Sequence, residues 1–436
     1  LGFRKALGTS YKLGPGMSIA SAARLPARLF RSHRLASASA APRHRASFGA
    51  CALGSALRGQ PGHPPLFFGD AGLLARWSAC RATPQTMQDI CEAGLDESRR
   101  LEHVRFLHRE LRIRLAHAAA VLNGLLPDLA EGHGIHDTVK RHVDSIRDLE
   151  YGPCPKTPAE NHEFVRLLEH MLAYHGDDTY HVVRDVCRST GSEDQELQVN
   201  TALERFFLLR IGTRFLLRHH VEASRGSRPG YSGVVQLDGD PAGIARRSAS
   251  ASARLCRAHL GQAPPIRVVE DGCGLPAFPC EPAALSYVLT ELFKNACRAV
   301  VERHAEGFDD DLPPVECRVA RSEAGLLVEV RDEGGGIRPE QLGKIGRFGQ
   351  STSSVSPWSS IGNGPAEGHP AGVLAGYGVG LALSRLFAQY FGGCLVISSE
   401  VGVGTTATLR MTWQGESSER LPLLSQAVTP ALPEVY

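Results

Sequence analysis

The sequence predicts an α+β protein in which an N-terminal antiparallel four-helix bundle precedes an α/β sandwich, and three observations carry this prediction. Apolar residues recur at three- and four-residue spacing through residues 73–223, as in amphipathic helices. Short strand-like runs alternate with helical runs through residues 234–415. Residues 224–233, between the two parts, are rich in Gly, Ser and Pro and are expected to form an interdomain linker.

Each helix of the predicted bundle lies between turn-forming residues. The apolar spacing marks four helical stretches: Arg105–Val121, Asp137–Leu149, Asn161–Tyr174 and Leu197–His220. Residues that commonly end helices separate them, at Asn123–Gly124, Gly152–Pro155 and Gly191. Modest loops between amphipathic helices favour antiparallel neighbours, and we therefore expect a bundle.

The second part is expected to place helices on one face of a mixed sheet. Helices are predicted over Ala242–Leu260, Pro282–His304 and Val379–Phe391. Strands are predicted at Ile266–Val269, as a pair near Val315–Arg331, and as a hairpin from Cys394 to Met411. A long segment rich in Gly, Ser and Pro, Phe348–Gly376, precedes the last helix, and a mobile lid is expected around Ser353–Ala375.

Residues 1–72 are expected to lie outside the folded domains, as a mitochondrial transit peptide and a disordered N-terminus. From Leu1 to Gly69 there is no Asp or Glu, whereas Arg recurs in an Ala- and Ser-rich background, which is typical of transit peptides. Met17 begins a plausible presequence. A basic nucleic-acid arm is the alternative, although such an arm normally contains more Lys. Residues 416–436 form a C-terminal tail without an informative pattern.

The bulk composition argues against several classes of protein. No apolar run reaches the roughly 18–20 residues that a membrane span requires, so no membrane insertion is expected. The net charge of +2 depends on the basic N-terminal segment, and no nucleic-acid partner is expected. The 11 cysteines form no CxxC pair, which argues against a zinc site or a disulfide framework. Dispersed thiols suit a reducing compartment such as the mitochondrial matrix.

The first candidate site lies on the helix predicted over Pro282–His304. Its apolar stripe is Leu285, Val288, Leu292, Ala296 and Ala299, and the opposite face carries Glu291, Lys294, Asn295 and Arg298. These four polar side chains suit a magnesium-bound nucleotide, because an amide oxygen can ligate Mg2+ and basic groups neutralise phosphate. Glu291 could also accept a hydroxyl proton. Taken alone, a solvated helix face is the preferred interpretation, because such faces are common.

Two glycine-rich turns supply further candidates. A half-buried strand delivers Asp332 into a turn that contains Gly334 and Gly336, where the carboxylate could accept a hydrogen bond from an adenine amine. A second stretch opens a helix, so its backbone N–H groups can point at phosphate oxygens. It comprises Gly376, Tyr377, Gly378, Val379, Gly380 and Leu381. A dinucleotide fold is the alternative for this stretch, but a strand would then precede it, and here a Gly/Ser/Pro segment does.

The fourth motif is the hairpin turn Glu400–Thr406, in which Thr405 and Thr406 could close a base pocket. Each of the four motifs is weak alone, and the turns could be purely structural. Their order along the chain is that of the N-box, G1, G2 and terminal boxes of GHKL ATPases, so the second part resembles the GHKL (Bergerat) fold. The resemblance implies that residues 234–415 form an ATP-binding kinase domain that uses Mg2+.

Outside these boxes, the chain resembles the mitochondrial kinases of pyruvate and branched-chain 2-oxoacid dehydrogenase complexes. The string ELFKNACRAVVERH at 291–304 is similar to their N-box, and Phe106–His117 and Glu204–His220 are similar to two of their helices. The resemblance covers about Leu101 to Met411. It implies a protein-serine kinase of the mitochondrial matrix that phosphorylates and inactivates the E1 α subunit. The helical part would dock the lipoyl domain of E2, and the chain would form a homodimer.

The resemblance also implies roles for individual residues. Glu291 would act as the base toward the target serine, and Asn295 would hold Mg2+, with Lys294 and Arg298 nearby. The remaining nucleotide contacts would be Asp332, for adenine, together with Ser351, Thr352 and the 376–381 stretch.

The chain departs from this family at two positions. Thr179 stands where the family has a His before two valines, and His175 or His181 is a candidate to replace it. Glu333 stands where the family usually has Arg. The paired His219-His220 and the absence of a clear Asp-Trp tail favour the branched-chain type. The body of the chain is equally compatible with a pyruvate dehydrogenase kinase.

Two other functions are compatible with such an ATP site. In a sensor histidine kinase, His108 would be the phospho-acceptor, but Arg109 separates it from Glu110, and His108 is expected to be a helix-surface residue instead. In a nucleotide-gated scaffold on the dehydrogenase core, the chain would not be catalytic. The intact Glu291 and Asn295 argue against that second function.

Overall fold

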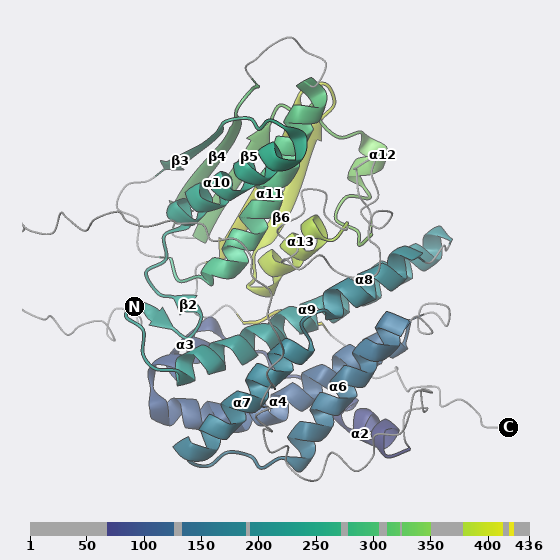
Figure 1. The fold of residues 1–436 in the computed structure, drawn as a ribbon, viewed down its shortest axis with the longest axis vertical. Coiled ribbons are helices and arrows are strands. Elements are labelled where there is room, and N and C mark those ends of the chain that lie inside the picture. The colour runs from purple at the N-terminus through teal and green to yellow at the C-terminus, as the bar shows by residue number, and fades with distance from the viewer. Residues whose placement is uncertain are drawn as a thin grey trace, which may run out of the picture. The chain divides into compact units, whose positions relative to one another are not determined.

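The computed structural model describes residues 68–125, 133–188, 192–271, 278–304, 312–322, 325–349, 378–412 and 418–422. From Pro64 onward the chain forms one compact unit, and the unit Leu1–His63 lies outside the described residues. Of the predicted transit peptide and N-terminus, only residues 68–72 are described, and they are helical. A helical part is followed by a part built on a five-stranded sheet (Figure 1).

All four predicted helices are present, and each begins earlier in the chain than its apolar pattern. They are α4 (Glu97–Asn123), α6 (His133–Tyr151), α7 (Pro158–Tyr174) and α9 (Glu193–Ser224). In α4, α7 and α9, capping side chains extend the helix into a polar first turn, which carries no apolar pattern. Asp96 accepts a hydrogen bond from the Arg99 N–H ahead of α4, and Thr157 forms a capping box with Glu160 ahead of α7.

Three helices of this part were not predicted from the sequence: α2 (Phe68–Ser78), α3 (Met87–Leu95) and α8 (Asp178–Arg188). α4 packs against α2, α3, α6 and α9 and lies at the centre of the helical part (Figure 1). None of the described helices combines the length and apolar character that crossing a bilayer requires. That the four long helices form an antiparallel four-helix bundle stays a prediction.

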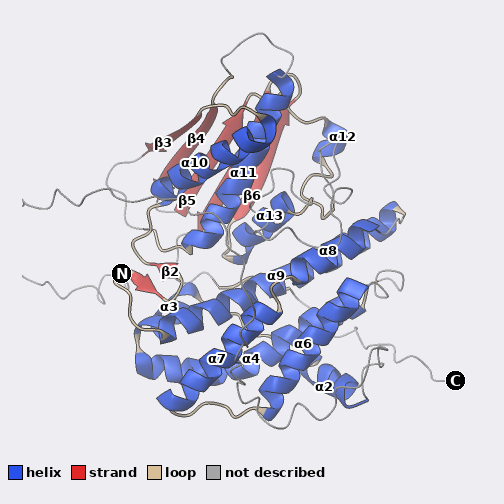
Figure 2. Cartoon of the chain, viewed as in Figure 1, coloured by secondary structure: helices blue, strands red, loops and turns tan. Residues whose placement is uncertain are grey.

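The sheet is mixed, with the strand order β3–β4–β5–β7–β6. Its strands are β3 (Ile266–Asp271), β4 (Val315–Ser322), β5 (Gly325–Asp332), β6 (Cys394–Glu400) and β7 (Gly404–Thr412). β3 and β4 run parallel, and the other neighbours run antiparallel. Helices α10 (Pro241–Leu260) and α11 (Pro282–His304) cover one face, which confirms the expected layering (Figure 2). Alternation along β5 sends Leu326, Val328 and Val330 into the core beneath them.

The helical and sheet parts are joined by the predicted linker and also by direct contacts between their elements. At the end of the predicted linker, β1 (Tyr231–Ser232) pairs with β2 (Val235–Gln236), which lies just beyond it. The Ser232 hydroxyl donates to the Cys91 carbonyl of α3 at 2.7 Å. Helix α13 (Gly380–Tyr390) packs on both α9 and α11. Its Tyr390 lies in the core of the helical part, whereas its Ala388 lies in the core beneath the sheet. The two parts therefore share a helix.

Candidate functional site

Glu291 and Lys294, on α11, form a buried ion pair. Lys294 Nζ lies 2.7 Å from Glu291 Oε1, and the two side chains are 1% (Lys294) and 7% (Glu291) exposed. A solvated helix face is therefore the wrong interpretation for these two residues. Burying either charge alone would be costly, so each stabilises the other. The ion pair also fixes the direction in which the carboxylate points.

Helix α13 covers the free side of this carboxylate. A β-carbon at Gly380 would lie 2.1 Å from Glu291 Oε2, so only glycine lets the first turn of α13 approach so closely. Val379, the residue before the helix, has an apolar side chain that cannot cap it. The first N–H groups of α13 are therefore left to an outside acceptor, for which phosphate is well suited. A buried carboxylate and a potential phosphate site meet here.

The remainder of the phosphate stretch is only partly described. Gly378 has a φ of +70°, a conformation that favours glycine, and its carbonyl accepts a hydrogen bond from the Gly349 N–H at 3.0 Å. Val379 is buried and Leu381 is half-buried. Four predicted nucleotide contacts lie outside the described residues, namely Ser351, Thr352, Gly376 and Tyr377. The predicted lid around Ser353–Ala375 lies outside them as well.

Asp332 ends β5 in a buried position between two backbone donors. The N–H groups of Gly334 and Thr405 donate to its Oδ1 at 2.9 and 3.3 Å. Burial raises the pKa of the Asp332 carboxyl, and the two N–H donors oppose that shift. Among the described residues, both of these hydrogen bonds end on Oδ1, which leaves Oδ2 for a donor from a ligand.

The turns around Asp332 fit together too closely for any residue other than glycine. A β-carbon at Gly336 would lie 2.1 Å from the Glu400 carbonyl oxygen, and one at Gly404 would lie 1.9 Å from the Asp332 carbonyl oxygen. The Ser399 and Thr405 hydroxyls lie 2.9 Å apart, and Thr405 and Thr406 pair with Asp332 and Arg331 across the ladder. The structure thus brings the second and fourth motifs together.

Asn295 and Arg298 are half-buried on α11. Asn295 lies one turn after Glu291 on the same helix face, and Arg298 Nε lies 3.6 Å from Glu302 Oε1. Amide and carboxylate oxygens are ligands that Mg2+ accepts, usually together with substrate phosphates. The amide oxygen of Asn295 therefore fits a magnesium ion bound to a nucleotide.

A buried carboxylate from the C-terminal tail, which sequence reasoning missed, lies at the far end of α13. Glu419 is 4% exposed and accepts hydrogen bonds from Arg114 on α4, at 2.8 Å to Oε1 and 2.6 Å to Oε2. The Tyr390 hydroxyl donates to the same carboxylate, as does the Gln85 N–H at 2.8 Å. No pattern marks an isolated Glu in a tail, so the sequence offered no signal for this residue.

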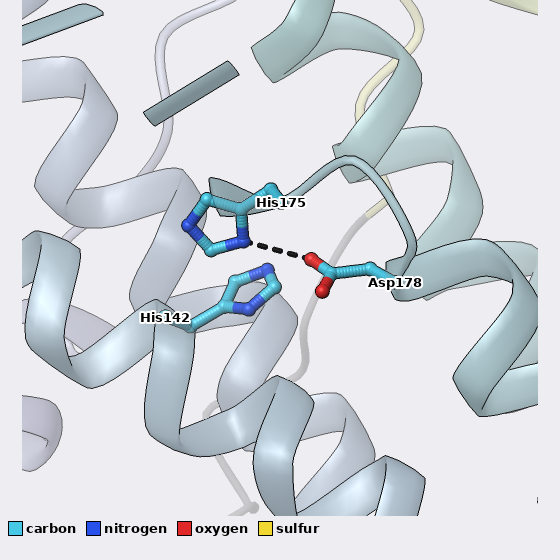
Figure 3. Close-up of side chains that lie close together, drawn as sticks. All are labelled: His142, His175 and Asp178. Carbon is cyan, nitrogen blue, oxygen red and sulfur yellow. Dashed lines mark hydrogen bonds and ion pairs between the residues drawn. The ribbon is translucent and has the colours of Figure 1, made fainter. Parts of the chain in front are cut away.

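In the part of the chain that the structure describes, one group of buried side chains has the spacing of a metal site, and it lies among α6, α7 and α8. His142, His175 and Asp178 converge there (Figure 3). Asp178 accepts hydrogen bonds from Arg141 at 2.7 Å and from Arg210 at 3.4 Å, and these guanidinium charges would repel a cation. We interpret the group as a buried charge network of the helical part.

One of the two histidines proposed to replace the missing family His, His175, belongs to this network. His175 Nδ1 lies 2.7 Å from Asp178 Oδ2, and its Nε2 lies 2.9 Å from Ser145 Oγ. Both ring nitrogens of His175 are therefore engaged inside the helical part. His181 is half-buried on α8, where burial and then the charges of Arg141 and Arg184 lower its pKa.

His108 is buried, so its expected position on a helix surface is wrong. It is 5% exposed, and its ring lies 5.8 Å from that of Phe164 on α7, which covers it. Arg112 Nη2 lies 3.0 Å from its Nδ1, and burial lowers its pKa. A histidine in this environment is not accessible to a phosphoryl donor.

Two protein-family models match the chain. The model of mitochondrial branched-chain alpha-ketoacid dehydrogenase kinase matches residues 84–236. The model described as histidine kinase-, DNA gyrase B-, and HSP90-like ATPase matches residues 280–414. The first covers most of the helical part, and the second includes all four sequence motifs.

Individual relatives match both parts together. The chain is 31% identical over 355 residues to the mitochondrial [pyruvate dehydrogenase (acetyl-transferring)] kinase of Arabidopsis thaliana. The matched region covers 80% of this chain and 95% of that relative. The protein of that name in Drosophila melanogaster is 28% identical, over 82% of this chain and 88% of the relative. Human isozyme 4 is 27% identical, over 82% of this chain and 89% of the relative.

Proposed function

Since the chain belongs to the family of mitochondrial pyruvate and branched-chain 2-oxoacid dehydrogenase kinases, we propose that it transfers the γ-phosphoryl group of ATP to a serine of the E1 α subunit and so inactivates the dehydrogenase complex. The observation that carries this proposal is the contact between Glu291 and the first turn of α13 at Gly380. It sets a carboxylate that can accept a proton beside N–H groups that can bind phosphate.

ATP would lie between Asp332 at one end of the site and the start of α13 at the other. Asp332 Oδ2 would accept a hydrogen bond from the exocyclic amine of adenine, and the N–H groups at the start of α13 would bind the phosphates. Ser351, Thr352, Gly376 and Tyr377 would complete these contacts. Asn295 would hold Mg2+, which when bound neutralises phosphate charge during transfer.

Glu291 would act as the base. It accepts the proton of the serine hydroxyl as that oxygen bonds to the γ-phosphorus, while the bond to the β–γ bridging oxygen breaks and ADP leaves. Lys294 holds Oε1 at 2.7 Å, so the other oxygen, Oε2, is the one directed toward α13. Lys294 is therefore a positioning residue for Glu291. Arg298 is more exposed than Lys294 and is the better placed of the two to contact phosphate.

The resemblance to the family supports the remaining elements of the proposal. They are docking of the E2 lipoyl domain on an antiparallel four-helix bundle, a homodimer, and a location in the mitochondrial matrix. The relatives are named as mitochondrial proteins, and the described cysteines are free thiols, which suits a reducing compartment.

Side-by-side labelling tests the proposed substrate. Purified pyruvate and branched-chain E1 are each incubated with the full chain, Mg2+ and γ-labelled ATP, and incorporation into each α subunit is measured. We expect label in the α subunit of one complex and a parallel loss of its dehydrogenase activity. A chain that binds isolated lipoyl domains and ATP but labels neither E1 would be a nucleotide-gated scaffold, and the kinase proposal would be abandoned.

Lowering the pH should weaken ATP binding through Asp332. Burial raises the pKa of this carboxyl above its ordinary value of 3.8. An adenine amine donates to the ionised form, so affinity is full above the Asp332 pKa and falls as the pH drops through it. The loss should therefore begin at a higher pH than for an ordinary Asp.

Equilibrium binding of a fluorescent ATP analogue between about pH 4 and pH 8 measures this loss. The Asp332→Asn variant should bind weakly throughout and lack the Asp332 step. A wild-type affinity that follows the same pH profile as Asp332→Asn would show that this carboxylate does not bind the base.

A further inference from the structure

Arg303, in the last turn of α11, reaches two turns that are far apart in the sequence. Its Nη1 donates to the carbonyl oxygens of Glu333 at 3.1 Å and Val403 at 2.8 Å, and its Nη2 donates to that of Gly402 at 2.8 Å. Glu333 lies in the glycine-rich turn after β5, and Gly402 and Val403 lie in the turn between β6 and β7. One side chain therefore connects three carbonyl groups of two turns.

These two turns flank Asp332, the residue proposed to bind adenine. The Gly402 N–H also donates to the Gly335 carbonyl at 2.8 Å, and the Ile337 N–H donates to the Ser399 hydroxyl at 2.8 Å, so two hydrogen bonds already join this region. Val401 and Val403, at the tip of the hairpin, are 59% and 46% exposed, and their side chains therefore contribute little packing. Arg303 adds three hydrogen bonds that tie both turns to α11.

We propose that Arg303 is a positioning residue for the nucleotide base: it holds the two turns at the separation at which Asp332 and the Thr405 N–H enclose adenine. The inference rests on the proposed nucleotide site. The planar guanidinium has donors in a fixed fork, which suits several carbonyls at once better than the single ammonium of Lys. Its position near the C-terminus of α11 also places a positive charge where the helix dipole favours one.

Arg303 lies on the same helix as Glu291, so α11 connects the adenine end of the site with the phosphate end. Arg303 follows Glu291 by 12 positions on the same helix, which at the usual rise corresponds to about 18 Å. Helix α11 thus carries the proposed general base, Glu291, near its middle. It carries Arg303, which holds the turns beside adenine, near its end. The contacts to adenine are the same before and during phosphoryl transfer. Losing the Arg303 hydrogen bonds should therefore weaken nucleotide binding and leave the chemical step intact.

The test compares three variants of the full chain: Arg303→Ala, Arg303→Lys and, as a matched control, Arg267→Ala, which removes an exposed arginine from β3 at the far edge of the sheet. Dissociation constants for ATP and GTP are measured without acceptor protein, and kcat and KM are measured with E1. The melting temperature Tm of each variant shows whether the fold is retained. Binding measured without acceptor keeps this test independent of which protein is phosphorylated.

We expect Arg303→Ala to raise the ATP dissociation constant and KM about tenfold, with kcat within about twofold of wild type. The preference for ATP over GTP should narrow, because guanine has a carbonyl oxygen in place of the 6-amino group that donates a hydrogen bond to Asp332. Arg303→Lys should recover only part of the affinity, and the Arg267→Ala control should behave as wild type. An unchanged ATP affinity in Arg303→Ala would overturn the proposal, as would equal losses for ATP and GTP accompanied by a fall in kcat and Tm.

Discussion

Replacing Glu291 with Gln should lower the rate of phosphoryl transfer by about 10²–10⁴-fold, the contribution usually made by a positioned general base. The amide keeps the size of the side chain and an oxygen that can accept from Lys294 Nζ, which lies 2.7 Å away. It cannot take the serine proton at neutral pH. ATP affinity should stay within about twofold of wild type, since the phosphate contacts belong to α13 and not to Glu291.

Single-turnover transfer to E1, together with equilibrium ATP binding, separates these two effects. The Glu316→Gln control, in an exposed carboxylate of β4, should transfer at the wild-type rate. Undiminished transfer by Glu291→Gln would refute the assignment of the base. Loss of ATP binding along with transfer would instead place Glu291 in the nucleotide contacts.

Replacing Glu419 with Ala should lower the free energy of unfolding by about 3 kcal/mol, because removing one partner of a buried ion pair leaves the other charge poorly satisfied. The Arg114 and Glu419 side chains are 0% and 1% exposed. Arg114 retains Glu110, whose Oε1 lies 2.9 Å from its Nε, which keeps the expected loss at the lower end of the range for such pairs. Tyr390 and Gln85 also lose an acceptor.

Urea denaturation of the full chain, followed by both tryptophan fluorescence and circular dichroism, measures this loss. Tyr390→Phe removes only the link from Glu419 to α13 and should cost about 1 kcal/mol. Glu340→Ala, in an exposed carboxylate of α12 (Pro339–Leu342), should cost almost nothing. If Glu419→Ala were no more destabilising than Glu340→Ala, the tail would not hold α13 on the helical part.

The layers of the fold could be predicted because they depend on periodic burial. Helix α11 was predicted with its observed bounds, since Pro282 begins it and its apolar residues follow one stripe. α4 was predicted from Arg105, whereas it begins at Glu97, because its first turns are polar and are held by the Asp96 cap. Helix α8 is amphipathic, but at 11 residues it is too short for the spacing of its apolar residues to identify it.

The content of the site was harder to predict than its location. The local sequence of each motif predicts the turn or helix that carries it. The site itself forms where segments far apart in the sequence meet, as β5 meets β7 and α11 meets α13. The burial of Glu291 and Lys294 could not be read from α11, because the covering element is α13, almost ninety positions further along. Glu419 could not be predicted at all, since its partners on α4 and α13 are specified only by the tertiary fold.

The chemistry and location of the transferred phosphoryl group test the central claim most directly. After a single turnover of the full chain with γ-labelled ATP and its E1 substrate, the label is located by digestion and its stability to acid is measured. We expect an acid-stable phosphoserine in the E1 α subunit and no stable label on the kinase. An acid-labile phosphohistidine on the chain itself, formed before or instead of label in E1, would contradict it.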